Sequence, residues 1–61
     1  MESLAVRKRV LLIDDDPRVR ASLKIVLEPI YDILQACDGQ EGLDVFRKDE
    51  PDLILLDVIL P

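Results

Sequence analysis

Two apolar runs in this chain of 61 residues are each followed directly by carboxylates. Val10–Ile13 leads into Asp14–Asp16, and Leu53–Leu56 leads into Asp57. Four unbroken apolar residues bounded by acids and prolines are typical of a strand buried on both faces of a parallel sheet. Sites in such sheets lie at the carboxyl ends of the strands. The two groups of aspartates therefore indicate a site at one edge of a sheet.

Asp14, Asp15 and Asp57 converge if the two apolar strands are neighbours. Two such charges roughly 5 Å apart repel by about 3 kcal/mol at an effective dielectric constant of 20. A divalent cation would offset this repulsion, and a set of oxygen ligands favours Mg²⁺, with Ca²⁺ or Mn²⁺ as substitutes. The alternative is that Asp14 and Asp15 are solvated in a turn. For Asp16 we favour a role as a helix cap.

The elements that must position these carboxylates follow from the intervening sequence. After the strand at 10–13, Asp16 and Pro17 are typical of a helix start. An apolar stripe then follows at helical spacing. It consists of Val19, Leu23, Val26 and Leu27. Pro29 disfavours helical geometry at Glu28, so we expect this helix to end there.

A less apolar second strand is predicted over 31–36. Asp38 and Glu41 have the spacing of a capping box, in which Asp38 caps a second helix and Glu41 reaches back. Leu43 and Phe46 share a face of that helix, and a third strand follows over 53–56.

The predicted fold class is α/β, a doubly wound parallel sheet reduced to β-α-β-α-β. Strand, helix, strand, helix and strand joined by short links favour parallel strands. The mixed second strand suits an edge, which gives the strand order 2-1-3. The third strand is then an apolar edge, and such edges pair with other chains. We therefore expect a homo-oligomer through this strand, most simply a two-fold dimer or one with exchanged segments.

Composition excludes several classes of function. Thirteen acidic against eight basic residues give a net charge of −5, which disfavours nucleic-acid binding. The short basic run 7–9 suits a solvated lead-in to the first strand. Cys37 is the one cysteine, so a reducing compartment fits, and no apolar run approaches the 18 residues of a membrane span. We expect a cytoplasmic setting without membrane contact.

Three segments resemble the response-regulator receiver domain of two-component signalling. They are residues 11–17, 36–43 and 51–61, which contain the acidic run, the Asp-Gly turn and the second acidic strand end. The resemblance implies a flavodoxin-like fold, with an N-terminal arm at 1–9 and a partial receiver domain at 10–61. It corresponds to the first half of a receiver.

The resemblance also implies a role for each residue of the site. Asp57 would accept a phosphoryl group from a histidine kinase. Asp15, Asp57 and the backbone carbonyl of Ile59 would bind Mg²⁺, and Asp14 would act through water. On this basis the chain is a phosphoacceptor signalling domain and not an enzyme.

Some features depart from the family pattern. The hydroxyl residue and the lysine that end the family's fourth and fifth strands lie beyond these 61 residues, so we expect the truncated chain to be signalling-incompetent alone and to bind Mg²⁺ weakly, if at all. Pro29 and Ile30 stand where a glycine-containing turn is common. Gly42 replaces a usual alanine, at a cost of about 1 kcal/mol in helix propensity.

Two other functions compete with this interpretation. Asp14 and Asp16 form an Asp-x-Asp pair like that of haloacid-dehalogenase-type phosphatases, in which Asp14 would be the nucleophile. Arg18, however, stands where that family usually has Thr or Val. The other alternative is a self-associating structural half-domain without activity.

Overall fold

The structure, a computed structural model, describes residues 7–56. Strands and helices alternate along the chain as predicted. They are β1 (Arg9–Ile13), α1 (Pro17–Leu27), β2 (Asp32–Ala36), α2 (Gly39–Asp49) and β3 (Leu53–Leu56). Neither helix has the length and apolarity needed to cross a membrane, within the part of the chain that is described.

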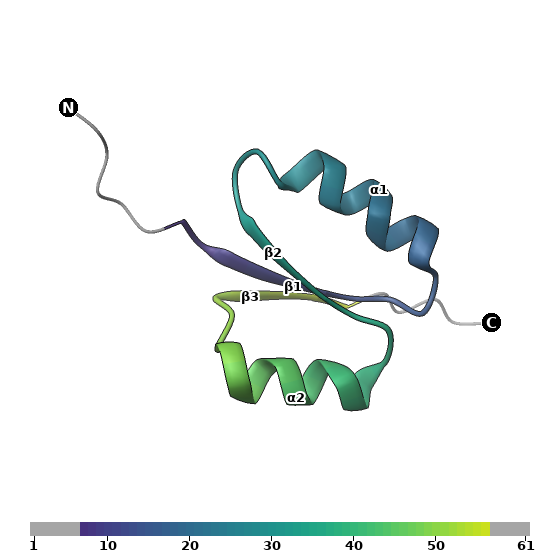
Figure 1. The fold of residues 1–61 in the computed structure, drawn as a ribbon, viewed down its shortest axis with the longest axis vertical. Coiled ribbons are helices and arrows are strands. Elements are labelled where there is room, and N and C mark those ends of the chain that lie inside the picture. Colours follow the sequence, from purple (N-terminus) through teal and green to yellow (C-terminus); the bar gives the residue numbers. More distant parts are fainter. Residues whose placement is uncertain (1–6, 57–61) are drawn as a thin grey trace.

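The three strands form one parallel sheet in the order β2-β1-β3, which confirms the predicted strand order. β1 pairs with β2 from Arg9↔Asp32 to Ile13↔Ala36 and with β3 from Val10↔Leu53 to Ile13↔Leu56. Figure 1 shows α1 on one face of the sheet and α2 on the other. All three strands therefore point their carboxyl ends toward the same edge.

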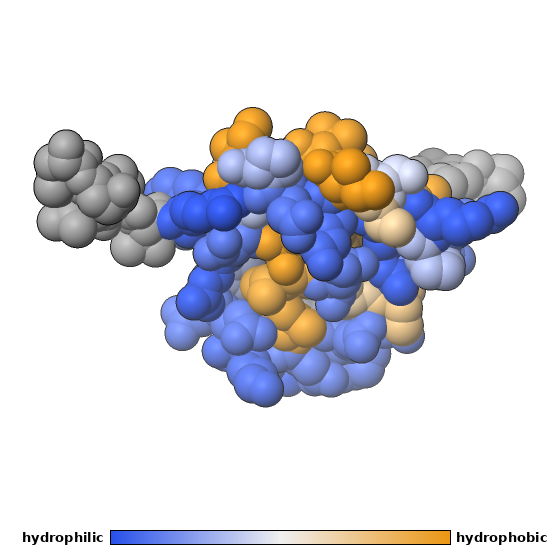
Figure 2. Space-filling view, turned by 45° about the horizontal axis from the view of Figure 1, so that its top comes forward, coloured by the Kyte–Doolittle hydropathy of each residue, from blue (hydrophilic) through white to orange (hydrophobic). Residues whose placement is uncertain are grey.

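The core is centred on β1, because this strand has a neighbour on each side and a helix over each face. Val10, Leu11 and Leu12 are at most 1% exposed, and Ala36 at the end of β2 is also buried. The predicted stripe on α1 is covered only in part. Val19 and Leu23 are 37% exposed, whereas Val26 is 67% exposed. Figure 2 shows hydrophobic residues, in orange, at the surface of the molecule.

α1 begins and ends where the sequence predicts, but the reason given for its end is wrong. Glu28 keeps right-handed helical geometry (φ −55°, ψ −35°) although Pro29 follows it. The helix is closed by the amides of Ile30 and Tyr31, which donate to the carbonyl oxygen of Leu27 at 2.9 and 2.8 Å. This turn also uses Tyr31, so β2 begins at Asp32, one residue later than predicted.

α2 lies close to β1 because Gly42 has no side chain. A Cβ atom built on Gly42 would lie 2.4 Å from Cδ1 of Ile13 and 3.0 Å from its Cγ1. The helix ends at Glu50, whose backbone is left-handed (φ 48°) and whose amide donates to the carbonyl oxygen of Phe46. Gly42, which departs from the usual alanine of the family, therefore allows α2 to pack closely against Ile13 of β1.

The basic residues 7–9 are exposed, as predicted, yet Arg7 and Arg9 form hydrogen bonds to distant parts of the chain. The Arg7 guanidinium donates to the carbonyl oxygens of Glu28 and Tyr31. Arg9 donates from its backbone amide to Oδ2 of Asp52 at 2.8 Å and from its side chain to the carbonyl of Asp49 at 2.7 Å. These bonds, together with pairing to β2, make Arg9 the first residue of β1, one position earlier than predicted.

Candidate functional site

Asp14 directly follows β1 and is held at the carboxyl edge of the sheet. Its amide donates to the carbonyl oxygen of Ala36 at 3.1 Å, and its Oδ1 accepts a hydrogen bond from the amide of Asp16 at 2.8 Å. The residue is only 4% exposed, so the alternative of a solvated Asp14 is wrong. Its Oδ2 atom is buried and finds no hydrogen-bond partner among residues 7–56. A buried carboxylate oxygen without a partner is costly and points to a ligand.

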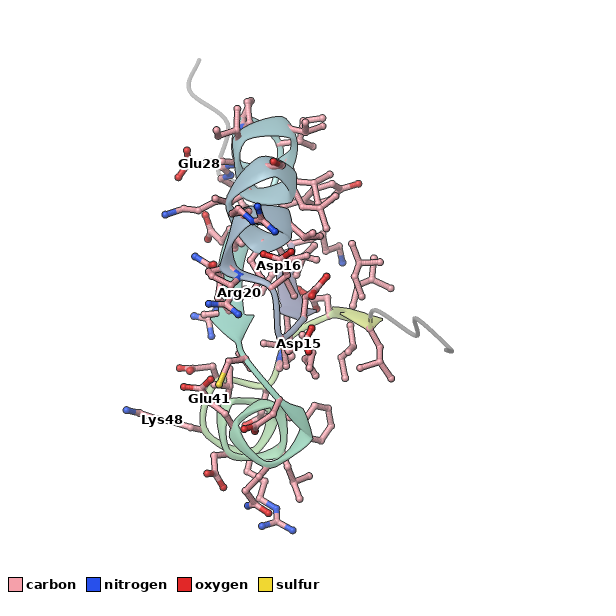
Figure 3. The ribbon with its side chains drawn as sticks, turned by 90° about the vertical axis from the view of Figure 1, so that its right-hand side faces the viewer. Asp15, Asp16, Arg20, Glu28, Glu41 and Lys48 are labelled. Atoms are coloured by element: carbon pink, nitrogen blue, oxygen red, sulfur yellow. The ribbon has the colours of Figure 1, made fainter. Side chains whose placement is uncertain are left out.

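Asp15 differs from its neighbours because its side chain is exposed. Figure 3, viewed onto the carboxyl edge of the sheet, shows Asp15 and Asp16 between the two helices. The position of Asp15 leaves its carboxylate accessible to a cation or a phosphoryl group.

Asp16 is the cap of α1, as predicted. Its Oδ1 accepts a hydrogen bond from the amide of Arg18 at 2.9 Å, and its carboxylate also contacts the Arg18 side chain. Hydrogen bonds from the Arg18 side chain and then from its amide hold the pKa of Asp16 below its usual value. The carboxylate of Asp16 is thus engaged by its own helix.

Arg20 is a part of this site that the sequence analysis missed. Its guanidinium donates to the carbonyl oxygen of Asp14 and lies 3.4 Å, Nε to Oε1, from Gln35. The signal was present, because a residue in the first turn of a helix directs its side chain back toward the preceding loop. Arg20 follows the cap Asp16 by one turn.

The loop between β2 and α2 borders the same edge. Asp38 caps α2 as predicted, with its Oδ1 accepting from the amide of Glu41 at 2.8 Å. Glu41 reaches back one residue further than the capping box requires, since its Oε1 accepts from the amide of Cys37 at 2.6 Å. The bond from the Cys37 amide lowers the pKa of Glu41, and the hydrogen bond with Glu41 raises the pKa of the exposed Cys37 thiol.

The remaining predicted site residues, Asp57 and Ile59, lie outside the described residues. β3 does run beside β1, and its last residue Leu56 is paired with Ile13, which immediately precedes Asp14. Within residues 7–56, no three acidic, His or Cys side chains are grouped so that they could hold a metal ion. The roles expected for Asp57 and Ile59 in binding a cation stay a prediction.

Small apolar hollows flank β3 on both faces. One of about 160 Å³ reaches Asp14 and lies under α1. It is lined by Leu12, Ile13, Asp14, Val19, Leu23, Leu55 and Leu56. The other, of about 360 Å³, lies under α2 and is lined by Ile13, Leu43, Phe46 and their neighbours. The carboxyl edge of the sheet, where Asp14 lies, therefore adjoins apolar surface that the described residues cover only in part.

The described residues form an α/β sheet with a buried and an exposed aspartate at the carboxyl end of its first strand, which is the edge where ligands bind in open sheets of this class. The model of the response regulator receiver domain matches residues 10–61, and the chain belongs to that family. This match decides against the phosphatase family considered above.

Named relatives agree with the family match. The chain is 38% identical over 56 residues to the probable transcriptional regulator ycf27 of Porphyridium aerugineum, which covers 90% of this chain and 23% of the relative. It is 46% identical over 54 residues to the DNA-binding dual master transcriptional regulator RpaA of Synechocystis, covering 87% of this chain and 22% of the relative. The chain thus spans about a quarter of the length of these relatives.

A solved structure supports the fold. The response regulator receiver modulated diguanylate cyclase from Pelobacter carbinolicus superposes with a TM-score of 0.82 at 31% identity. The superposition covers 84% of this chain and 55% of that one. The sheet order and the two flanking helices are therefore those of a receiver domain.

Proposed function

We propose that this chain carries the acidic part of a phosphorylation site, in which Asp57 accepts a phosphoryl group from a histidine kinase. The observation that carries the proposal is the buried Asp14, whose Oδ2 has no partner among residues 7–56, beside the exposed Asp15 at the carboxyl end of β1. β3, which leads into Asp57, is the direct neighbour of β1. In the transfer step, a carboxylate oxygen of Asp57 would form a bond to phosphorus as the phosphorus–nitrogen bond to the kinase histidine breaks.

The residues present fit a divalent cation. Asp15, Asp57 and the carbonyl of Ile59 would hold Mg²⁺, with Ca²⁺ or Mn²⁺ as substitutes, and Asp14 would act through water. All of these donors are oxygen atoms, which such cations prefer. When bound, the cation would supply positive charge to the phosphoryl oxygens. Asp16 is left to its capping role.

The partner, setting and output form part of the same proposal. A histidine kinase is the phosphoryl donor in the cytoplasm, and the net charge of −5 argues against nucleic-acid binding by this segment. The relatives are named as transcriptional regulators and as a receiver-modulated diguanylate cyclase. Phosphorylation here would accordingly control a linked output region and would not itself be catalysis.

The test is phosphorylation of a longer protein that contains this chain by a small acyl phosphate. Asp57→Asn should abolish acid-labile labelling, whereas Asp44→Asn, which alters an exposed carboxylate on α2, should not. Omitting Mg²⁺ should suppress labelling of the unchanged protein. Full labelling of Asp57→Asn, with the modified residue mapped to Asp14, would contradict the assignment and revive the Asp-x-Asp nucleophile.

Self-association through β3 is a second proposal, favoured by a separate observation. All four residues of β3 are between 37% and 58% exposed, although a strand this apolar is expected to be buried on both faces. Pairing of β3 with its copy would satisfy edge amides, each of which costs about 1–3 kcal/mol if held away from water without a partner. We propose that the 61-residue chain forms a homo-oligomer through this edge.

A further inference from the structure

Arg20 contacts the backbone of the loop that carries the acidic residues, and among residues 7–56 it forms no ion pair with their carboxylates. Its guanidinium donates to the backbone carbonyl oxygen of Asp14, and its Nε faces Oε1 of Gln35 on β2. The amide of Asp14 is meanwhile bonded to the carbonyl oxygen of Ala36. Both backbone polar groups of Asp14 are therefore fixed from outside the loop, one by β2 and one by α1.

Fixing the carbonyl of Asp14 also fixes the start of Asp15. The peptide unit between them is planar, so the position of the Asp14 oxygen sets the position of the Asp15 nitrogen and of its Cα atom. Figure 3 shows Arg20 beside Asp15 and Asp16 at the carboxyl edge. The position from which the Asp15 side chain leaves the backbone therefore depends in part on the bond from Arg20.

Electrostatics alone would not favour an arginine at this place. A guanidinium beside carboxylates that bind a cation competes with that cation and weakens its binding. Arg18 provides the comparison, since it also belongs to the first turns of α1 and interacts with Asp16, but its side chain is 90% exposed. The two arginines carry the same charge, but the Arg18 side chain contacts the carboxylate of Asp16, whereas that of Arg20 donates to the backbone carbonyl oxygen of Asp14.

We propose that Arg20 is a positioning residue for the acid loop, Asp14–Asp16. It holds the Asp14–Asp15 peptide in the orientation that presents Asp15 to a cation. This inference rests on the proposed function for its purpose, although the ordering of the loop by Arg20 can be measured without a metal.

The first experiment measures amide hydrogen exchange in the metal-free 61-residue chain. Arg20→Met should accelerate exchange at the amides of Asp14 and Asp16 by about tenfold or more, since hydrogen bonds from charged donors are among the stronger ones. The amide of Leu12 in β1 reports on global opening and should change less. Arg18→Met is the matched control and should leave all three amides at the rates of the unchanged chain.

The second experiment titrates Mn²⁺ and Mg²⁺ into the same variants. Arg20→Met should weaken binding several-fold even though it removes a competing positive charge, whereas Arg18→Met should leave binding unchanged or tighten it. Arg20→Lys, which keeps the charge and one donor, should recover part of the affinity and of the protection at Asp16.

Each outcome decides the proposal. Unchanged exchange at Asp14 and Asp16 in Arg20→Met, or metal binding that tightens as in Arg18→Met, would overturn it. Equal acceleration at Leu12 and Asp16 in both Arg20 variants would also overturn it, because Arg20 would then stabilise the whole fold. If the unchanged chain binds no metal, as the weak binding expected of these 61 residues allows, the exchange rates alone decide the role of Arg20.

Discussion

Glu41 contacts the exposed Cys37 and is the largest of several causes that raise the pKa of its thiol. The Glu41 carboxylate accepts a hydrogen bond from the amide of Cys37, and the negative charge of Asp38 acts on the thiol in the same direction. Because the thiolate is the reactive form, an exposed cysteine with a raised pKa reacts slowly at neutral pH. Exposure alone would give the opposite expectation.

Glu41→Gln should therefore accelerate alkylation of Cys37. Glutamine keeps an oxygen that can accept from the Cys37 amide but removes the negative charge, so the pKa of the thiol falls toward its usual value. The measurement is the pH dependence of the rate of reaction with iodoacetamide, whose midpoint should lie above the usual pKa of a cysteine thiol in the unchanged chain and move down in the variant. Asp44→Asn, one turn further along α2, is the control, and an equal effect there would exclude a specific role for Glu41.

Gly42 is a second residue whose contribution to the stability of the fold depends on one contact. Its lack of a side chain lets α2 approach Ile13, and an added Cβ atom would lie 2.4 Å from Cδ1 of Ile13. Alanine gains about 1 kcal/mol in helix propensity. Overpacking costs about 1–3 kcal/mol, so the second effect exceeds the first unless Ile13 can move away.

We predict that Gly42→Ala lowers the free energy of unfolding in urea. Ile13→Val removes Cδ1, so Gly42→Ala should be less harmful in that background, with a coupling of about 0.5–1.5 kcal/mol for residues in direct contact. Strictly additive effects of the two substitutions on the free energy of unfolding would show that the contact with Ile13 is not what makes Gly42→Ala destabilising.

At the scale of elements, the two helices end differently although a glutamate follows each. Glu28 after α1 is right-handed helical, whereas Glu50 after α2 is left-handed with φ 48°. The left-handed conformation costs a residue with a Cβ atom about 1–2 kcal/mol, and glycine avoids this cost. The same substitution should therefore have opposite effects at the two helix ends.

Glu50→Gly should raise the free energy of unfolding by about 1 kcal/mol, and Glu28→Gly should lower it by about 0.5–1 kcal/mol. Glu50→Ala separates conformation from charge, because it removes the carboxylate but keeps the Cβ atom. Thermal and urea unfolding of the three variants provide the measurement. A gain in stability for Glu50→Ala equal to that for Glu50→Gly would assign the effect to charge.

The elements themselves were predictable because each depends on residues close in sequence. The apolar purity of 10–13 placed β1 at the centre, the polar positions of the second strand placed it at an edge, and Asp16 and Asp38 marked the two helix starts. The spacing of Arg20 from the cap Asp16 indicates a side chain directed toward the preceding loop, but its particular contacts with Asp14 and Gln35 depend on how α1 is oriented over the sheet. The shift of Glu41 from Asp38 to Cys37 has the same origin, because it is set by the exact path of the loop.

At the scale of the whole molecule, the sheet is unevenly covered. Val10, Leu11 and Leu12 of β1 are buried, while β3 exposes apolar side chains beside hollows on both faces. An apolar edge of this kind favours pairing with a second chain, and a charged side chain on such an edge opposes it. Leu53 suits a test, because it lies at the opposite end of β3 from the acid loop, Asp14–Asp16, and is 51% exposed.

Leu53→Lys should shift the 61-residue chain toward monomer in light scattering across a dilution series. Ile25→Lys, which alters a side chain 73% exposed on α1, is the matched control and should leave the assembly unchanged. A folded monomer of the unchanged chain at micromolar concentration would contradict association through β3.

The parallel pairing of β1 with β3 also determines how the molecule would respond to tension. A pull applied at Arg9 and at Leu56 acts on opposite ends of two adjacent strands that run in the same direction. The force would therefore be shared along four paired positions at once, from Val10↔Leu53 to Ile13↔Leu56, and would not open them one after another. β2 pairs with β1 over five positions, yet it lies to the side of this path and would carry no tension until β1 and β3 had separated.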